Sequence, residues 1–352
     1  SGSSRELKAR SRLRAHLDIL LGSTNVELVR ETLSLLEEAS VRPRTRALYR
    51  KAMDDLLRFC ERQDPVVDLD DESTVDAALT AYANALFAKG HHRSQFERTL
   101  AAFLFFLPEF GRSGVLALPR TYRALKGFRL KCPGRSRRPH PLAFWQAFAT
   151  DLSLRGHTLM GIWVVLCFHA YLRPGECMSL QPQDFVPPVG GVQGFWSLLV
   201  FPEERAERSK VGESDNSIIL DAPWAQWMNE VLEILGDRPQ GGSVWNFTYA
   251  HLVAQFKESS RRLGVQVVPY QCRHSGASRD RATNLRPLFE VQKRGQWKSD
   301  KSVMRYEKGG RLAQTFAMYP PALQGWIEAV APFHADILLG HGLVPINPPP
   351  FA

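Results

Sequence analysis

The chain has 352 residues, of which 44% are apolar and 23% charged, and these fractions exclude a chain that is disordered throughout. Lysine and arginine outnumber aspartate and glutamate by 45 to 36, which gives a net charge of +9. This balance favours polyanionic partners, with nucleic acid first and a membrane surface second. At about 150 residues per domain, the length predicts two domains.

The first 130 residues show helical patterns and no strand signal. Residues 1–24 predict a basic amphipathic helix or arm, which is either a solvated face or a segment that follows DNA. Residues 25–130 predict a compact bundle of four or five helices, because apolar residues recur there at helical spacing. The predicted helices cover 25–39, 43–59, 75–87, 96–107 and 120–128, with an acidic loop at 64–73.

A basic segment separates the two halves of the chain. Between Pro119 and His140 there are eight basic residues and no acidic one, and prolines and a glycine from 133 to 141 interrupt regular structure. We place a linker at 131–140, where a basic run is either simply solvated or follows a phosphate backbone. The candidate DNA-binding residues are Arg44, Arg93, Arg120, Arg123, Lys126, Arg129, Lys131, Arg135, Arg137 and Arg138.

The second half predicts a mixed domain over 141–335, so that the whole chain is mainly α with a small β-sheet (α+β). Helices are expected over 141–151, 157–171, 224–235, 249–263 and most of 272–331. Short strands are expected at 196–201 and 217–220, on either side of a polar turn, and 265–268 is a further β-prone run. Residues 336–352 form a proline-rich tail, and its end, 345–352, is expected to be unfolded.

Five scattered cysteines form no C-x-x-C pair and lie beside no histidine cluster. They argue against a disulfide framework and a zinc site, and they are typical of a reducing compartment. The longest apolar run, 161–172, is too short to span a bilayer. We therefore expect no membrane partner, no metal and no cofactor.

The common catalytic patterns, such as the P-loop and G-x-S-x-G, do not occur in the sequence. What remains in the second half is a set of basic residues and one tyrosine. Arg173 ends an apolar helix in YLRPGECMSL, and Glu176 can pair with it, as in an ordinary structural salt bridge. Lys210 lies in a hairpin turn, RSKVGE, where a lysine is normally just exposed to solvent.

Three further segments follow in order: PYQCRHSGAS, RGQW and SVMRYEK. Taken alone, Trp297 and Tyr306 also fit core aromatics at helical spacing. The complete order of Arg, Lys, Arg-His, Trp and Tyr, however, resembles the tyrosine recombinase (phage integrase) superfamily over roughly residues 40–330. The segment SVMRYEK is particularly similar to mobile-element members of the Crypton and DIRS type.

The resemblance implies a helical, SAM-like core-binding domain followed by a tyrosine-recombinase catalytic domain, together forming a C-shaped clamp around duplex DNA. It implies a site-specific recombinase or integrase that cleaves and rejoins DNA without metal through a 3′-phosphotyrosyl intermediate. The implied partners are double-stranded DNA and further copies of the chain, two per site and four per synapse. The compartment would be nuclear in a eukaryote and cytoplasmic otherwise.

The resemblance also implies roles for the phosphate-binding residues. Arg173 and Arg273 would bind the non-bridging oxygens of the scissile phosphate, because a guanidinium offers two parallel hydrogen bonds and stays charged. Glu176 would orient Arg173. The indole N–H of Trp297 would donate to the phosphate, although it cannot carry a proton.

Tyr306 would be the nucleophile, and the cationic cluster would stabilise its phenolate, since a phenol has a pKa near 10. Lys210 would protonate the leaving 5′ oxygen. The family usually has His or Lys three residues before Arg273, whereas this chain has Tyr270, a poor proton acceptor. His274, directly after Arg273, matches a histidine that many family members have at this position. The resemblance implies a structural or secondary role for it.

Four alternatives stay open at this point. Tyr319 is a competing nucleophile, although no second set of motifs surrounds it. A DNA-binding relic that has lost efficient cleavage is favoured by Tyr270. A type IB topoisomerase is the third alternative, because it shares this chemistry. The fourth is a structural or protein-interaction module, which would require the motifs to be coincidental.

Overall fold

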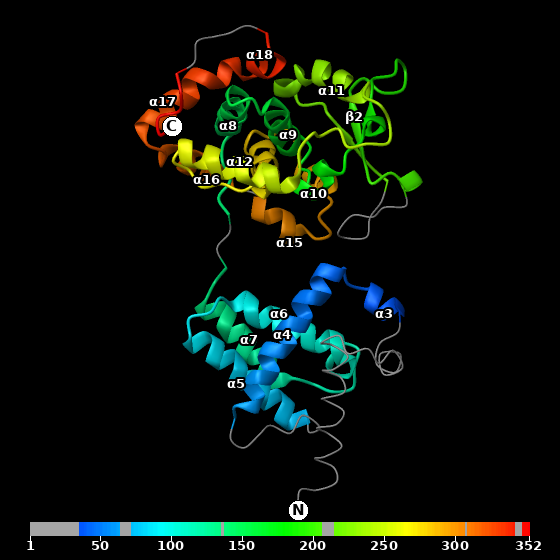
Figure 1. Ribbon diagram of the computed structural model, residues 1–352, viewed down its shortest axis with the longest axis vertical. Helices are drawn as coiled ribbons and strands as arrows, with labels where there is room; N and C mark the ends of the chain where they lie inside the picture. The colour runs from blue at the N-terminus through cyan, green and yellow to red at the C-terminus, as the bar shows by residue number, and fades with distance from the viewer. Residues whose placement is uncertain (1–34, 64–71, 135–136, 206–214, 307, 342–346) are drawn as a thin grey trace, which may run out of the picture. The chain divides into compact units, whose positions relative to one another are not determined.

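The computed structural model of the chain describes residues 35–63, 72–134, 137–205, 215–306, 308–341 and 347–352. The predicted arm at 1–24, Arg135 and Lys210 lie outside these residues. Figure 1 shows many helices and one small sheet, which confirms the predicted α+β class. The chain divides into two compact units, residues 1–135 and 136–352. None of the described helices is long and apolar enough to cross a membrane.

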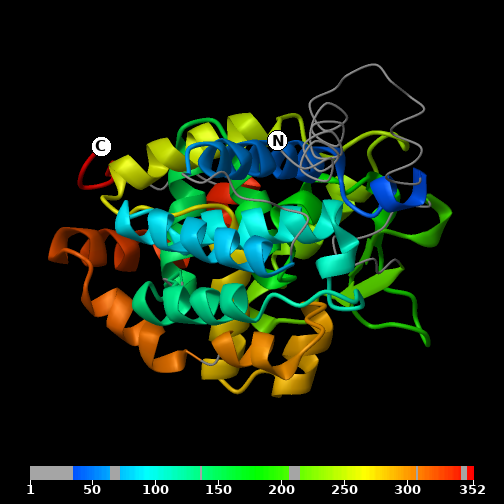
Figure 2. The ribbon, with the colours of Figure 1, turned by 90° about the horizontal axis from the view of Figure 1, so that it is seen from below.

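The first unit is a helical bundle whose members lie side by side (Figure 2). Its core is built from buried residues such as Leu79, Phe96 and Phe103. The buried carboxylate of Asp76 accepts hydrogen bonds from two backbone N–H groups at the start of α7, at 2.8 and 2.7 Å, and so fixes that helix to α5. The described elements are α3 (Leu35–Ala39), α4 (Pro43–Glu61), α5 (Glu72–Ala88), α6 (Arg93–Phe106), η1 (Pro108–Phe110) and α7 (Pro119–Lys131).

The second unit is built around two central helices, α8 (Leu142–Leu154) and α9 (Thr158–His169). Every residue of α9 from Met160 onward is buried, as expected of a helix that is apolar all round. Around this pair pack α12 (Tyr249–Arg262), α13 (Tyr270–Ala282), α17 (Pro321–Val330) and α18 (His334–Leu339) (Figure 1). The remaining helical elements are α10 (Pro174–Met178), η2 (Pro182–Asp184), η3 (Glu203–Arg205), η4 (Pro223–Ala225), α11 (Met228–Gly236), α14 (Leu288–Arg294), α15 (Asp300–Val303), η5 (Met304–Tyr306), α16 (Gly309–Ala317) and η6 (Ala331–Phe333).

The sheet of the second unit has three antiparallel strands in the order β1 (Phe185–Val186), β2 (Ser197–Val200) and β3 (Asn216–Ile219). The two predicted strands correspond to β2 and β3, which pair with Leu198 opposite Ile218. Both of these side chains are buried in the same core as α8 and α9. The β-prone run at 265–268 does not join the sheet, because the backbone N–H of Val267 donates to the Ser260 hydroxyl instead.

The end of the chain corrects one prediction. Residues 347–352 were expected to be unfolded, but they pack on the second unit. The backbone N–H of Phe351 donates to the Arg262 carbonyl at 3.1 Å, and its ring lies against Gly264. The Trp326 indole donates to the Asn347 carbonyl at 2.9 Å. The prediction followed proline content alone, which carries no information on contacts with residues that are distant in the sequence.

Candidate active site

Four separate segments of the second unit bring together Arg173, Glu176, Arg273, Trp297 and Tyr306. They are the start of α10, the first turn of α13, the loop after α14, and η5. Helix α13 lies directly on α9. A Cβ at Gly276 would stand only 1.9 Å from the Phe168 carbonyl oxygen, so the close approach depends on that glycine.

Glu176 joins the two arginines. Its Oε1 accepts from Arg173 Nη1, and its Oε2 accepts from the Arg173 backbone N–H at 2.7 Å. The same Oε2 lies 3.7 Å from Arg273 Nη1. Because Glu176 is only 4% exposed, one buried carboxylate compensates two guanidinium groups, and the cluster keeps a net positive charge.

Arg273 is 1% exposed, so its guanidinium is almost completely out of water. Nη1 donates to the Tyr171 carbonyl and Nη2 to the Gly295 carbonyl. Its Nε is buried and has no acceptor among the described residues. Burial, and secondarily the positive charge of Arg173, lower the pKa of Arg273. A buried cation with an unpaired donor is costly, so the site favours an anionic ligand.

Aromatic rings form one wall of the site. The Trp297 ring lies under the Arg273 guanidinium at 4.4 Å and beside the Tyr306 ring at 4.4 Å. The His274 ring also packs against the Tyr306 ring, with centroids 4.7 Å apart. Burial, with the charge of Arg273 second, lowers the pKa of His274 to about 4, so this imidazole is neutral at neutral pH. Tyr306 is itself buried, at 6% exposure.

Tyr270, which departs from the family pattern, is the first residue of α13. Its ring packs against the His274 ring, with centroids 5.1 Å apart. The Arg137 guanidinium lies over the Tyr270 ring, 5.8 Å from its centroid. The structure therefore places Tyr270 beside the site. A phenol at this position can donate a hydrogen bond, but it accepts a proton poorly.

A network of hydrogen bonds and ion pairs supports the site, and the sequence analysis did not predict it. Tyr171 has a left-handed backbone, with φ of 52°, and its hydroxyl donates to buried Asp280. Arg286 donates to Asp280 and, by two bonds, to Asp221, while Arg294 binds the His169 carbonyl. Burial lowers the pKa of Arg294 to about 10. These contacts link residues up to 125 positions apart, and no local pattern marks them.

Tyr319, the competing tyrosine, is buried between α16 and α17. Gln271 Oε1 accepts the Val268 backbone N–H, so its Nε2 must donate, and it does so to the Arg138 carbonyl and to His140 Nε2. His140 therefore carries its proton on Nδ1 and donates it to the Tyr319 hydroxyl at 2.6 Å. Tyr319 is thus part of the packing that holds the start of the second unit to α13.

The buried His140 makes the stability of the second unit dependent on pH. Burial, and secondarily Arg138, lower the pKa of His140 to about 4. The unfolded chain therefore binds a proton before the folded one does, and stability falls as the pH drops from about 6.5 to 4. This site should contribute about 3 kcal/mol of that loss.

Chemical unfolding of His140→Gln at pH 7 and pH 4 measures this contribution. The variant should lose less stability over this range than the wild type, whereas His251→Gln, at an exposed histidine, should match the wild type. Equal losses in His140→Gln and the wild type would contradict the assignment.

The described basic residues of the first unit that we expect to bind DNA gather on α7. Arg120, Arg123, Lys126 and Lys131 are exposed, as is Arg44 on α4. Arg129 is also exposed but pairs with Glu97 at 2.8 Å, and Arg93 is half-buried. In the second unit, Arg137 and Arg138 are exposed.

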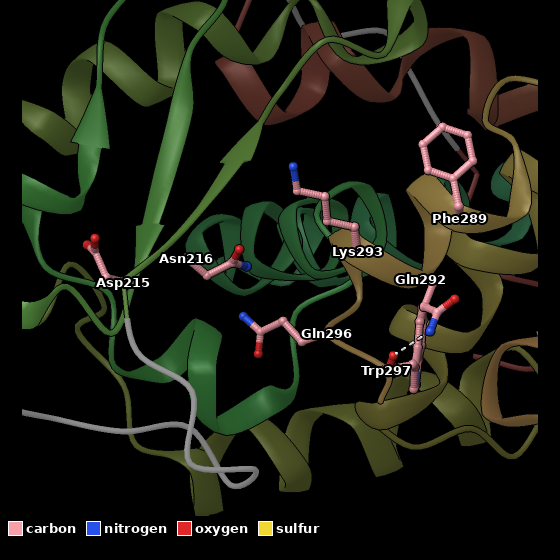
Figure 3. A pocket seen from close by; sticks show the side chains of 7 residues that line it. All are labelled: Asp215, Asn216, Phe289, Gln292, Lys293, Gln296 and Trp297. Carbon is pink, nitrogen blue, oxygen red and sulfur yellow. Dashed lines mark hydrogen bonds between the residues drawn. The ribbon is translucent and has the colours of Figure 1, made fainter. Parts of the chain in front are cut away.

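A cavity of about 400 Å³ opens beside the site, between the start of β3, α14 and the loop that follows α14 (Figure 3). Its lining includes Asn216, Lys293, Gln296 and Trp297. Trp297 thus belongs both to the aromatic wall and to the cavity. In the part of the chain that the structure describes, no group of three or more His, Cys, Asp or Glu residues is arranged to hold a metal ion.

The chain was compared with known proteins. No protein-family model matches the sequence, and no curated protein matches it. Among solved structures, the Tn1549 transposon integrase in complex with transposon right-end DNA matches with a TM-score of 0.51 and 12% identity, covering 85% of this chain and 98% of that chain. The XerH site-specific recombinase bound to palindromic difH substrate matches with a TM-score of 0.48 and 13% identity, covering 90% and 91%. On the Tn1549 match, this chain has the fold of the tyrosine recombinases and integrases.

Proposed function

We propose that this protein is a DNA strand-cleaving and rejoining enzyme of the tyrosine recombinase type, acting as a site-specific recombinase or integrase. The observation that carries the proposal is the pair Arg173 and Arg273, joined by buried Glu176 and set beside Tyr306. Two fixed guanidinium groups with one shared carboxylate suit a singly charged phosphodiester.

The proposed reaction is an exchange of phosphate esters. The Tyr306 hydroxyl loses its proton to solvent and its oxygen attacks the scissile phosphorus, so that a 3′-phosphotyrosyl bond forms and the bond to the 5′ oxygen breaks. Arg173 and Arg273 stabilise the charge on the non-bridging oxygens, and the Trp297 indole N–H donates to the same phosphate. Lys210 gives the leaving oxygen its proton. The reverse reaction rejoins the strands without ATP, because the phosphotyrosyl bond keeps the energy of the original ester.

Double-stranded DNA is the proposed partner, bound through the exposed cations of α7 together with Arg44, Arg137 and Arg138. Such contacts are to phosphates, so affinity should fall steeply with salt. We further propose that copies of the chain associate on DNA, two at each site and four in a synapse.

A second candidate function is a DNA-binding protein that keeps the fold and has lost efficient cleavage. Tyr270 is the observation that favours it, because the phenol replaces the usual imidazole or ammonium group beside the site. The two candidates differ in one outcome, the formation of a covalent bond to DNA.

Replacing Tyr270 with histidine should leave cleavage unchanged or faster. An imidazole with an ordinary pKa near 6.5 can accept and return a proton at neutral pH, which a phenol does poorly. The measurement is the single-turnover cleavage rate at pH 7.5, with Tyr270→Phe as the control that removes only the hydroxyl. A collapse of cleavage in Tyr270→His would show that Tyr270 has a role of its own.

The test of the proposed function is strand cleavage in a pool of duplexes with randomised sequence, in the presence of EDTA. The proposal expects cleaved strands whose 3′ ends carry protein. Salt-sensitive binding without cleavage would favour the second candidate. Absence of binding at low salt would contradict both. Relaxation of supercoiled plasmid without sequence preference would point to a type IB topoisomerase.

A further inference from the structure

Gln296 has an unusual backbone at the end of α14. The N–H of Gln296 binds the Lys293 carbonyl and the N–H of Trp297 binds the Gln292 carbonyl, which is the Schellman arrangement. The position after the C-cap is normally glycine because its φ is positive, yet here it is Gln296, with φ of 51°.

The glycine stands one position earlier, for a different reason. Gly295 has an ordinary φ of −88°, but a Cβ there would lie 2.0 Å from the Trp297 ring. A glutamine is therefore held in a strained conformation where a second glycine would fit more easily. Strain of this kind recurs at functional sites.

The side chain of Gln296 reaches Arg173. Its Oε1 accepts from Arg173 Nη1 at 3.2 Å, and Glu176 Oε1 accepts from the same nitrogen. Both hydrogens of Nη1 are thus used. Among the described residues, no acceptor binds the side-chain Nε or Nη2 of Arg173, and these two nitrogens form one of the edges by which a guanidinium binds a phosphate bidentately.

The surroundings of Gln296 show that it does not serve to fill the core. It lines the cavity beside the site, and Figure 3 shows its amide turned toward that of Asn216 across the open space. Asn216 Nδ2 is itself buried without an acceptor among the described residues. Among the described residues, Arg173 is the one partner to which the Gln296 side chain forms a hydrogen bond.

We propose that Gln296 is a positioning residue for Arg173, which rests on the proposed function. Its amide oxygen fixes Nη1, so that the Nε–Nη2 edge stays available to the scissile phosphate. An uncharged acceptor suits this task, because a second carboxylate would cancel the positive charge that Glu176 leaves on the arginine pair. The strained backbone is the structural cost of placing that amide.

The test separates rate from stability. Gln296→Gly removes the amide and relieves the backbone, so its melting temperature should equal or exceed that of the wild type, while single-turnover cleavage falls about tenfold or more. Gln296→Glu should also cleave more slowly. Asn284→Gly is the matched control: Asn284 has the same left-handed backbone just after the end of α13, with φ of 53°, but it is exposed and does not bind Arg173, so the rate of this variant should stay within about threefold of the wild type.

A second readout uses a neutral methylphosphonate at the scissile position. Because this group lacks one charged oxygen, the difference between wild type and Gln296→Gly should shrink. An active wild type with an equally active Gln296→Gly would overturn the inference and leave the proposed function intact. Parallel loss of stability and rate would overturn it too, by showing a structural role. A wild type that cleaves no duplex of the pool would overturn the proposed function, and the inference with it.

Discussion

Replacing Arg273 with alanine should lower strand cleavage about 10³-fold while most of the DNA affinity remains. Arg273 is the more deeply buried arginine of the pair, and its Nε has no acceptor in the part of the chain that the structure describes. The Trp297 ring packs against its guanidinium group at 4.4 Å. Loss of a preorganised donor to a developing charge costs about 10²–10³ in rate, and here several donors are lost together. Affinity depends mostly on exposed cations elsewhere, so it should fall little.

The measurement pairs single-turnover cleavage with equilibrium binding to the same duplex at two salt concentrations. Arg273→Lys keeps the charge without the planar fork, and it should still lose at least tenfold in cleavage. Arg261→Ala, on the surface of α12, serves as the control and should behave as the wild type. Affinity that falls in proportion to cleavage would contradict the assignment of Arg273 to the phosphate.

Replacing Glu176 with alanine should destabilise the second unit by about 3–5 kcal/mol, because it leaves one buried and one partly buried guanidinium group without their shared counter-charge. The start of α10 also loses the acceptor of the Arg173 backbone N–H. Cleavage should fall as well, since both arginines lose the partner that orients them. Chemical denaturation followed by tryptophan fluorescence reports the change.

The matched control for this variant is Glu258→Ala. Glu258 also accepts two hydrogen bonds from an arginine, Arg261, but the pair is exposed on α12. Exposed pairs contribute little, so this variant should unfold as the wild type does. If Glu176→Ala unfolded at the same denaturant concentration as Glu258→Ala, Glu176 would not hold the arginine pair together.

Local patterns predicted the parts of the fold that depend on local spacing. The helices α4 to α9 and the strands β2 and β3 follow apolar periodicity, and the structure places them close to the expected bounds. Strand β1 has only two residues and exists because β2 pairs with it, so no local pattern could mark it. The end of the chain was wrongly predicted as unfolded, because its ordering depends on a donor about 20 residues away, the Trp326 indole, and on an acceptor about 90 residues away, the Arg262 carbonyl.

In the candidate site, too, local sequence patterns predicted the contacts between nearby residues but not those between distant ones. The spacing of three residues between Arg173 and Glu176 was sufficient to predict their pairing, and the ordered motifs were sufficient to group Arg273, Trp297 and Tyr306. The contact of Gln296 with Arg173 crosses 123 positions and requires a left-handed backbone. Sequence reasoning has no signal for such a conformation at a glutamine, since glycine is the residue expected in a left-handed turn and Gly295 stands directly before it.

Covalent capture is the measurement that tests the account most directly. The protein is incubated with a randomised pool of nicked duplexes in EDTA, denatured, and examined for DNA bound to protein, with Tyr306→Phe alongside. The account predicts an adduct in the wild type that is lost in Tyr306→Phe and maps to Tyr306. An adduct that survives in Tyr306→Phe, or salt-sensitive binding that never yields an adduct, would contradict it.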